Sequence, residues 1–334
     1  MLDRAWRTGS EGVGCSQSRA GLVRRVWLRC IRAAVLFFLF MLGTNSVSAA
    51  PLDVVVVTSG DTESYTAIAR RIEQEVASKG LGRVRSISIG NVASLAAAGP
   101  RTVIIAVGLK ATQAVLESSS DAPLISTLIP EAGFHAATTR AGKPSASAVY
   151  LDQPLARQLD LVRATQPGSM RVGVLLGPQS AALLPALQIE ARRRGLQLNV
   201  AKISSESELF PALDGVLKDA DVLLSVPDQL VFNPQTIPSV LFNAYRHRVP
   251  VIGFSQAYVR AGALAAVFST PEQLADDVVD ILARCVDNPR VLPPPQHPGR
   301  FSVVTNDQVA RSLDLALDRE ETIAQRLRSR EGKP

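Results

Sequence analysis

Small and polar residues follow the apolar, strand-like segments of this sequence, and their types suit the binding of a small ligand. At such turns, free backbone N–H groups of helix N-termini can hold a carboxylate or another anionic group. Asp228 ends an apolar segment, where its carboxylate could receive a ligand ammonium group. The same residue types also cap helices for structural reasons, so each turn alone allows either role. The candidate ligand-binding residues are Ser59, Gly60, Asp61, Gly108, Lys110, Thr112, Ile129, Pro130, Gln179, Ser180, Asp228, Gln229, Ser255 and Gln256.

Catalytic chemistry has no matching pattern in the sequence. Its three histidines, His135, His247 and His297, lack partners at metal-ligand spacing. The sequence contains no GxSxG elbow, no GxxxxGK[ST] loop and no GxGxxG after a strand. We therefore expect no catalytic residue, no metal and no cofactor. An enzyme would need an acid–base pair, for which the candidates are Asp61, Glu131 and Asp228.

The elements that must position these turns alternate between strand and helix. Short apolar, β-branched runs such as LDVVVVT are typical of strands buried on both faces of a parallel sheet. In the first half, strands are predicted at 52–58, 84–89, 102–107, 123–129 and 146–151, and helices at 62–79, 93–98 and 109–116. In the second half, strands are predicted at 171–176, 198–203, 221–226, 250–254, 263–268 and 301–305. The helices predicted there are 153–164, 181–194, 206–217, 235–248, 271–286 and 307–328, the last broken near Asp318. The pattern predicts two doubly wound α/β halves of similar size.

The first fifty residues have the pattern of a secretory signal peptide. Arg24, Arg25, Arg29 and Arg32 precede the apolar run AAVLFFLFMLG, and small residues follow it. The run has 11 residues, about half of the roughly 20 that a membrane-spanning helix needs. We expect cleavage after Ala49, so that the protein acts outside the cytoplasm. An uncleaved membrane anchor is the alternative.

Removal of this leader changes the charge and the cysteine content. The whole chain carries a formal charge of +6, but residues 1–49 hold seven Arg and two acids, which leaves 29 basic and 28 acidic residues. Near-neutrality argues against a nucleic-acid partner. Cys285 is the one cysteine after the leader, so we expect no internal disulfide, and its apolar helical context predicts a buried thiol. About 285 remaining residues suit two domains.

Four segments resemble the substrate-binding proteins of ABC transporters, in particular the branch that binds tryptophan or tyrosine. They are IIAVGLKATQAVL at 104–116, LSVPDQLVF at 224–232, VPVIGFSQAYVRAGALAAV at 249–267 and VTNDQVARSLDLAL at 304–317. The resemblance implies a type I periplasmic binding protein fold, with two doubly wound parallel-sheet domains joined by a hinge. It implies three crossings between domains, which gives a first domain of 50–152 plus 267–295 and a second of 153–266 plus 296–330. Gln229 departs from the family, which has Asn at this place.

The resemblance implies that the protein captures a small molecule, possibly an amino acid, in an interdomain cleft and delivers it to an inner-membrane ABC permease. The partners would be this ligand and the permease, the protein would be a periplasmic monomer, and it would not be an enzyme. A sensor or accessory subunit of the same fold, which acts through protein contacts, is the alternative. It would need an exposed apolar patch.

Overall fold

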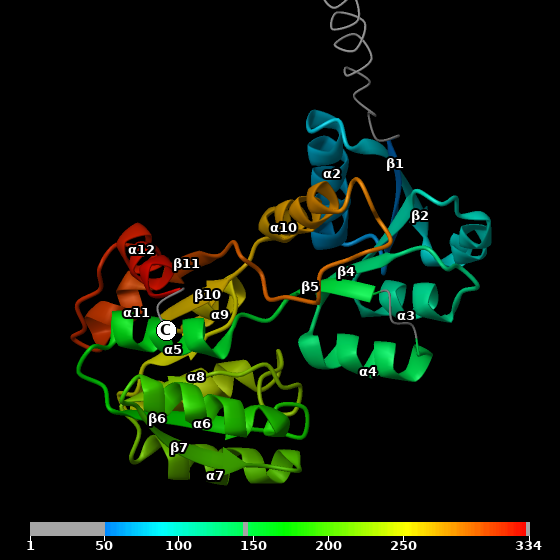
Figure 1. The fold of residues 1–334 in the computed structure, drawn as a ribbon. Coiled ribbons are helices and arrows are strands. Elements are labelled where there is room, and N and C mark those ends of the chain that lie inside the picture. Colours follow the sequence, from blue (N-terminus) through cyan, green and yellow to red (C-terminus); the bar gives the residue numbers. More distant parts are fainter. Residues whose placement is uncertain (1–50, 143–145, 332–334) are drawn as a thin grey trace, which may run out of the picture. The chain divides into compact units, whose positions relative to one another are not determined.

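The computed structural model describes residues 51–142 and 146–331 (Figure 1). The chain divides into Met1–Ala50 and Pro51–Pro334, and all of the described elements lie in the second unit. The predicted signal peptide and its cleavage after Ala49 lie outside the described residues. Within those residues, none of the helices combines the length and the apolar character that crossing a bilayer requires.

The first sheet has five parallel strands in the order β2-β1-β3-β4-β5. They are β1 (Leu52–Thr58), β2 (Gly82–Ser88), β3 (Thr102–Val107), β4 (Leu124–Ile129) and β5 (Ala146–Tyr150). The connecting helices are α2 (Glu63–Ser78), the 3-10 helix η1 (Ile89–Ala97), α3 (Leu109–Glu117) and α4 (Glu131–Ala141). This order places the reversal of strand order, where ligands of such sheets bind, between β1 and β3.

Successive side chains of β1 enter two different cores, as the two-residue period of a strand requires. Val54 and Val56 pack with α2 and with α10 (Pro271–Arg284), whereas Val55 and Val57 pack with η1 and α3. Both faces of the sheet are therefore covered by helices, which explains the uninterrupted apolar run in the sequence.

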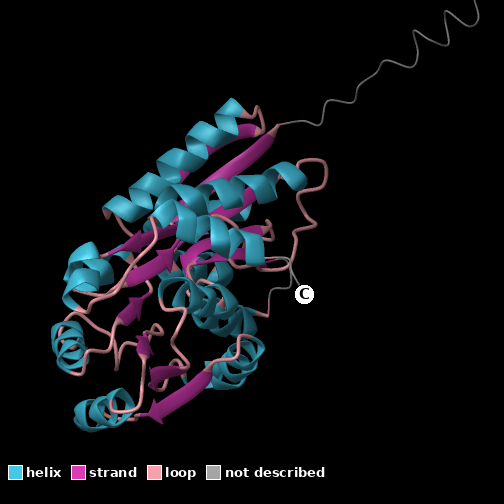
Figure 2. Ribbon diagram, turned by 90° about the vertical axis from the view of Figure 1, so that its left-hand side faces the viewer, coloured by secondary structure: helices cyan, strands magenta, loops and turns pink. Residues whose placement is uncertain are grey.

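The second sheet has the order β11-β10-β9-β8-β6-β7, in which β11 alone is antiparallel to its neighbour. Its strands are β6 (Arg171–Leu176), β7 (Gln197–Lys202), β8 (Val222–Leu224), β9 (Val251–Gly253), β10 (Ala265–Phe268) and β11 (Ser302–Thr305). Its helices are α5 (Leu155–Thr165), η2 (Ala181–Leu183), α6 (Leu184–Arg193), η3 (Glu206–Glu208), α7 (Leu209–Leu217), α8 (Ile237–Arg246), α9 (Gln256–Ala261), α11 (Asp307–Ser312) and α12 (Glu320–Arg330). Residues of α5, α6 and α12 pack on one face, and residues of α7, α8 and α9 on the other, so that the strands lie between helices in Figure 2.

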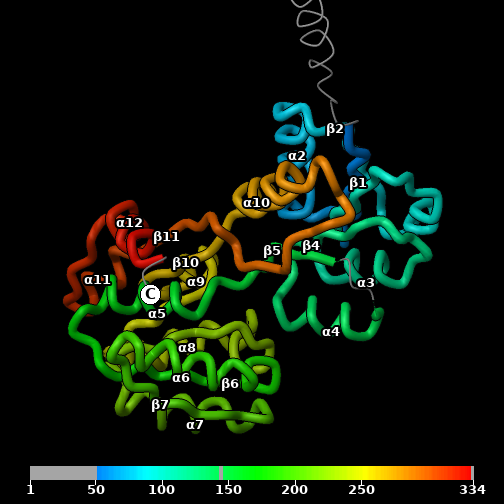
Figure 3. Tube along the Cα trace, viewed as in Figure 1, coloured from blue at the N-terminus to red at the C-terminus, as the bar shows by residue number. Residues whose placement is uncertain are grey.

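The chain passes three times between the elements of the two sheets. Helix α10 follows β10 of the second sheet but packs against α2 of the first (Figure 1). From α10 the chain runs past β5, where Gln296 pairs with Val149, and then enters β11 (Figure 3). Buried Gln153 donates to Ser269 at 2.9 Å, and the guanidinium of buried Arg157 donates to the carbonyl of Pro298 at 3.0 Å. These bonds tie the three crossing segments together.

The predicted fold class is confirmed: the chain forms two parallel-dominated, doubly wound α/β sheets. The eleven expected strands all occur in the described part of the chain, with ends shifted by a few residues. The break near Asp318 is present, between α11 and α12. Helices α4 and α9 were not expected. Strand β10 extends to Phe268 within the second sheet, and the division into two domains stays a prediction.

Candidate functional site

The predicted ligand residues lie at the carboxyl ends of the strands, around the reversal point of each sheet. In the first sheet this point lies between β1 and β3, and in the second between β6 and β8. Ligands of open α/β sheets bind outside such points. The fold therefore brings the predicted turns of each half close together. The contacts of each residue show whether its side chain is used within the protein or is free to contact a ligand.

In the first sheet, Ser59 and Gly108 form a tight junction between the β1 and β3 turns. The Ser59 hydroxyl accepts a hydrogen bond from the Ala111 N–H at 2.9 Å, and thereby caps the first turn of α3. Gly108 has φ +91°, and a Cβ there would lie 2.6 Å from Ser59 Oγ and 2.9 Å from the Tyr65 ring. The ring of Tyr65 also lies beside Gly60. Gly108 is thus required by both its backbone conformation and its neighbours.

Other predicted residues of the first sheet are buried and already bonded. The Thr112 hydroxyl is fully buried and lies 3.0 Å from the Gly108 carbonyl and 3.1 Å from Ser126 Oγ. Ile129 is fully buried in an apolar cluster. Neither side chain is available to a ligand, whereas Pro130 is exposed at the start of α4.

Exposed groups remain at this edge of the first sheet. Asp61 and Lys110 are exposed, and in the described part of the chain neither side chain has a hydrogen bond or ion pair. Leu109, at the start of α3, is 38 % exposed, and Leu151, just after β5, is 40 % exposed. A free ammonium group at a helix N-terminus, with two exposed leucines at the same edge of the sheet, could hold a ligand that has both an anionic group and an apolar body.

The backbone is strained where β4 ends. Leu128 has φ +52°, which is rare for a bulky residue, and the pairing of β4 with β5 shifts its register between Thr127 and Ile129. Such strain often lies near functional sites. Leu128 lies two residues before Pro130, the residue that precedes α4.

In the second sheet, Asp228 joins the turns that follow β6 and β8. Its carboxylate accepts the N–H groups of Gln179 at 3.0 Å and of Ser180 and Leu230 at 2.9 Å, and the Ser180 hydroxyl at 2.9 Å. A Cβ on Gly177 would lie 2.3 Å from the same carboxylate. The four donors account for a buried charge here without a ligand, and give Asp228 and Ser180 a structural role.

The remaining predicted residues of the second sheet are at least partly exposed. The Gln179 amide oxygen accepts the Gln229 N–H at 3.2 Å, while Ser255 precedes α9 without capping it and Gln256 is exposed. Phe254, between β9 and Ser255, has its ring 4.5 Å from that of Tyr258 and 6.4 Å from that of Phe232. Burial raises the pKa of Tyr258, whose buried hydroxyl has no hydrogen-bond partner among the described residues. The second sheet thus has aromatic rings beside the predicted turn.

Two of the three histidines converge on one carboxylate at the end of β4, which the sequence did not reveal. Glu131 Oε1 lies 3.7 Å from His135 Nε2, and Glu131 Oε2 lies 3.7 Å from His297 Nε2. The ring of Tyr150 lies between the two imidazoles, with centroids 6.0 Å and 5.4 Å away. The sequence separation of Glu131 and His297 explains why no local pattern indicated this contact.

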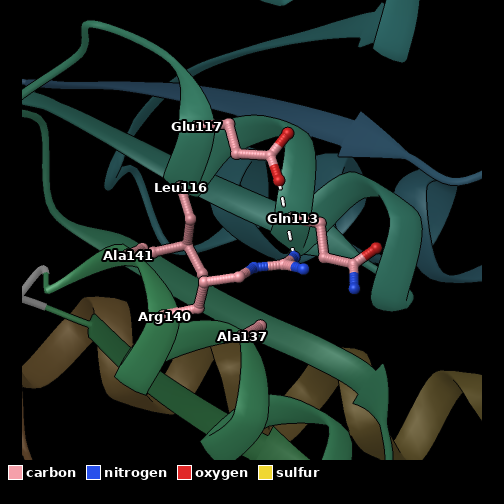
Figure 4. Close-up of a pocket in the computed structure, with 6 residues that line it drawn as sticks. All are labelled: Gln113, Leu116, Glu117, Ala137, Arg140 and Ala141. Carbon is pink, nitrogen blue, oxygen red and sulfur yellow. Dashed lines mark hydrogen bonds and ion pairs between the residues drawn. The ribbon is translucent and has the colours of Figure 1, made fainter.

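A cavity of about 300 Å³ lies elsewhere, between the C-terminal halves of α3 and α4 (Figure 4). It is lined by Gln113, Leu116, Glu117, Ala137, Arg140 and Ala141. Glu117 and Arg140 form an ion pair across it at 3.4 Å. None of the predicted ligand residues lines this cavity, because those on α3 and α4 are at the opposite, N-terminal ends of the helices.

The described residues contain no group of three or more His, Cys, Asp or Glu side chains placed to hold a metal ion. Cys285 is buried, as expected, and burial raises the pKa of its thiol.

The chain is similar to known proteins in both sequence and fold. It is 23 % identical over 233 residues to a tyrosine-binding protein of Clostridioides difficile, a match that covers 67 % of this chain and 66 % of that relative. The match thus spans slightly less than two thirds of the relative's length.

Two solved structures share the fold. A ligand-free, open substrate-binding protein with adhesive properties from Clostridium difficile has a TM-score of 0.63 at 18 % identity, and the match covers 81 % of this chain and 97 % of that one. An ABC domain in complex with L-Trp from Streptococcus pneumoniae has a TM-score of 0.53 at 17 % identity, with 82 % and 98 % covered.

The model of one protein family, the ABC transporter substrate binding proteins, matches residues 85–320. This range includes both sheets apart from β1 and the first three residues of β2, together with the predicted turns other than the one at residues 59–61. The chain belongs to the family of ABC transporter substrate-binding proteins.

Proposed function

We propose that this protein is exported, binds an amino acid between the two sheet-based domains, and delivers it to an ABC permease of the inner membrane. In this proposal it is a monomer of the periplasm, it has no catalytic role, and its signal peptide is cleaved after Ala49. The proposed domains are 50–152 plus 267–295 and 153–266 plus 296–330. Family membership supports the general role, because substrate-binding proteins capture small molecules.

The observation that carries the amino-acid proposal is the mixed chemistry of the first sheet's edge. Lys110 is exposed and unpaired within the described residues, and it lies in the first turn of α3, where backbone N–H groups favour a carboxylate. Leu109 and Leu151 supply exposed apolar surface at the same edge. A carboxylate on an apolar body matches these groups, and an amino acid has that composition.

The aromatic rings of the second sheet support a ligand with a large side chain. Phe254 is half-buried beside Tyr258, next to the predicted turn residues Ser255 and Gln256. Rings at binding sites bury large apolar areas and prefer offset or edge contacts with other rings. The relatives named for tyrosine and for L-Trp agree with this composition.

A thermal-shift screen tests the proposal. The chain is purified after export, freed of ligand by unfolding and refolding, and tested with the twenty amino acids, nucleosides, sugars and small organic anions. A ligand at about one hundred times its dissociation constant adds roughly 2.7 kcal/mol of stability, which should raise the unfolding midpoint by several degrees. We expect a higher unfolding midpoint with one group of amino acids. A shift for sugars alone, or for no compound, would contradict it.

A further inference from the structure

The cluster of Glu131, His135, Tyr150 and His297 combines groups from three separate segments. Glu131 and His135 lie one turn apart on α4, Tyr150 ends β5, and His297 belongs to the third crossing. The side chains of Glu131 and His297 are 39 % and 35 % exposed, and that of His135 is 58 % exposed. The cluster is therefore open to a ligand, unlike the carboxylate of Asp228.

The neighbour of His297 determines which ring nitrogen carries a proton. His297 Nδ1 lies 3.1 Å from the backbone carbonyl of Asp152, and a carbonyl oxygen can only accept. Nδ1 must therefore donate. In the neutral ring, Nε2 then carries a lone pair, and this lone pair faces Glu131 Oε2 at 3.7 Å.

His135 meets Glu131 in a similar way. Its Nε2 lies 3.2 Å from the Tyr150 hydroxyl and 3.7 Å from Glu131 Oε1. Burial, with smaller contributions from Glu131 and Asp152, raises the pKa of Tyr150 to about 12, so its hydroxyl keeps its proton and can donate to the imidazole. In the neutral ring that accepts this bond, Nε2 has no proton to offer to Glu131.

When both imidazoles are neutral, two carboxylate oxygens and two imidazole nitrogens thus face one another as acceptors. Both carboxylate contacts, at 3.7 Å, are longer than hydrogen bonds, so the Glu131 side chain keeps its accepting capacity. The neighbouring carboxylate of Asp152 is already used, because it accepts the Glu131 backbone N–H at 2.6 Å. A positively charged group with several N–H donors would satisfy this arrangement. A metal ion is not favoured, since no group of described side chains is placed to hold one.

We propose that Glu131, flanked by His135 and His297, receives the ammonium group of the ligand. This inference rests on the proposed function and assigns to the first sheet the contact that the sequence suggested for Asp228. Helix α3 packs against α4, and a Cβ on Gly133 would lie 3.6 Å from the Leu109 side chain. Glu131 is therefore close to the α3 N-terminus, where Lys110 would hold the carboxylate of the same amino acid.

The test compares ligands with and without an ammonium group on two proteins. L-tyrosine is paired with 3-(4-hydroxyphenyl)propanoate, and L-tryptophan with 3-indolepropanoate. Any other amino acid that binds in the screen is paired with its own desamino analogue. Wild type should bind the amino acid about 10- to 100-fold more tightly than its analogue, as expected for one charge-assisted contact. Glu131→Gln should lose most of this preference and bind both members with similar affinity.

Glu131→Gln should fold, because the hydrogen bond to Asp152 comes from the backbone of residue 131 and not from its side chain. Urea unfolding checks this point. Glu117→Gln is the matched control, since this carboxylate is 67 % exposed at the far end of α3, and it should leave the preference unchanged.

The outcomes distinguish failure of the proposed role of Glu131 from failure of the proposed function. Wild-type binding of an amino acid that Glu131→Gln leaves unchanged would overturn the role of Glu131 and leave the proposed function intact. The same holds if the desamino analogue binds wild type as tightly as the amino acid. If wild type binds no amino acid, both proposals are overturned.

Discussion

Ser180 donates both its backbone N–H and its hydroxyl to the carboxylate of Asp228, each at 2.9 Å. This contact joins the turn after β6 to the turn after β8 at the point where strand order reverses in the second sheet. The residue that looked most like a ligand contact in the sequence is thus held by the protein itself. It maintains the position of the neighbouring exposed residues, Gln179 and Gln229.

Replacement of Asp228 by Ala should destabilise the protein by about 2–4 kcal/mol, because several buried donors would lose their acceptor together. Urea unfolding of the variant and of wild type measures the difference. Asp61→Ala is the matched control and should change stability by less than about 0.5 kcal/mol, because this exposed side chain has no partner among the described residues. Equal effects of the two substitutions would show that the Asp228 contacts do not hold the turns.

The junction of Ser59 and Gly108 makes a second prediction. Gly108→Ala should destabilise the protein by more than about 1 kcal/mol, because φ is +91° and the new Cβ would lie 2.6 Å from Ser59 Oγ. Gly215→Ala is the opposite case, since no neighbouring atom lies within 4 Å of the added Cβ and the residue is exposed within α7. It should gain about 0.5–1 kcal/mol through helix propensity. Thermal or urea unfolding of both variants measures the two changes in stability. Changes of the same sign would contradict this prediction.

The predicted pH dependence of stability comes from Asp152. Burial raises the pKa of its carboxyl above the ordinary 3.8, although the Glu131 backbone N–H opposes this rise. The folded protein then binds this proton more tightly than the unfolded chain, so wild type loses stability as pH rises from about 3.8 through the raised pKa. Asp152→Asn has no such proton, and its stability relative to wild type should increase over this interval and stay constant above it.

Urea unfolding at a series of pH values between about 3.5 and 7 measures this difference for Asp152→Asn. Asp61→Asn serves as the control for general effects of charge removal. If the stability of Asp152→Asn relative to wild type does not change with pH, or falls as pH rises, burial does not raise the pKa of Asp152.

Arg157 should be important for the joint between the crossing segments. Its buried guanidinium donates to Gln153, to the carbonyl of Pro298 and to Glu331, and lies 4.2 Å from the centre of the Phe301 ring. Arg157→Leu should cost about 2–4 kcal/mol, because it leaves the buried acceptors of Gln153 and Pro298 unpaired.

Arg140→Leu is the control for Arg157, since Arg140 and its partner Glu117 are 65 % and 67 % exposed. Exposed ion pairs contribute at most about 1 kcal/mol, so this variant should unfold near the wild-type midpoint. If Arg157→Leu unfolds there too, the buried network does not stabilise the crossings.

Most of the fold could be predicted from sequence because its strands are buried on both faces. The run from Val54 to Val57 has no polar interruption, and its alternate residues enter two cores. Helix α4 was missed because its sequence, EAGFHAATTRA, buries only Phe134 and Ala137 and thus has little apolar periodicity. Helix α9 spans six residues, too few for a period to be visible.

The site was predicted less completely than the fold. The turns after the strands could be placed because chain order determines which strand ends meet. The sequence could not tell capping residues from available ones: Ser59 caps α3 and Ser255 does not cap α9, a difference that tertiary structure creates. The approach of His297 to Glu131 depends on the third crossing, which returns from α10 past β5.

The most direct test of the central claim is isothermal titration calorimetry of the refolded, ligand-free protein with L-tyrosine, L-tryptophan and the other amino acids. Small-angle X-ray scattering then compares the protein with and without the amino acid that binds most tightly. The account predicts saturable binding at one site and a smaller radius of gyration with ligand, because binding proteins of this fold close around their ligands by hinge motion. Absence of heat and of any change in scattering for every amino acid would contradict the account.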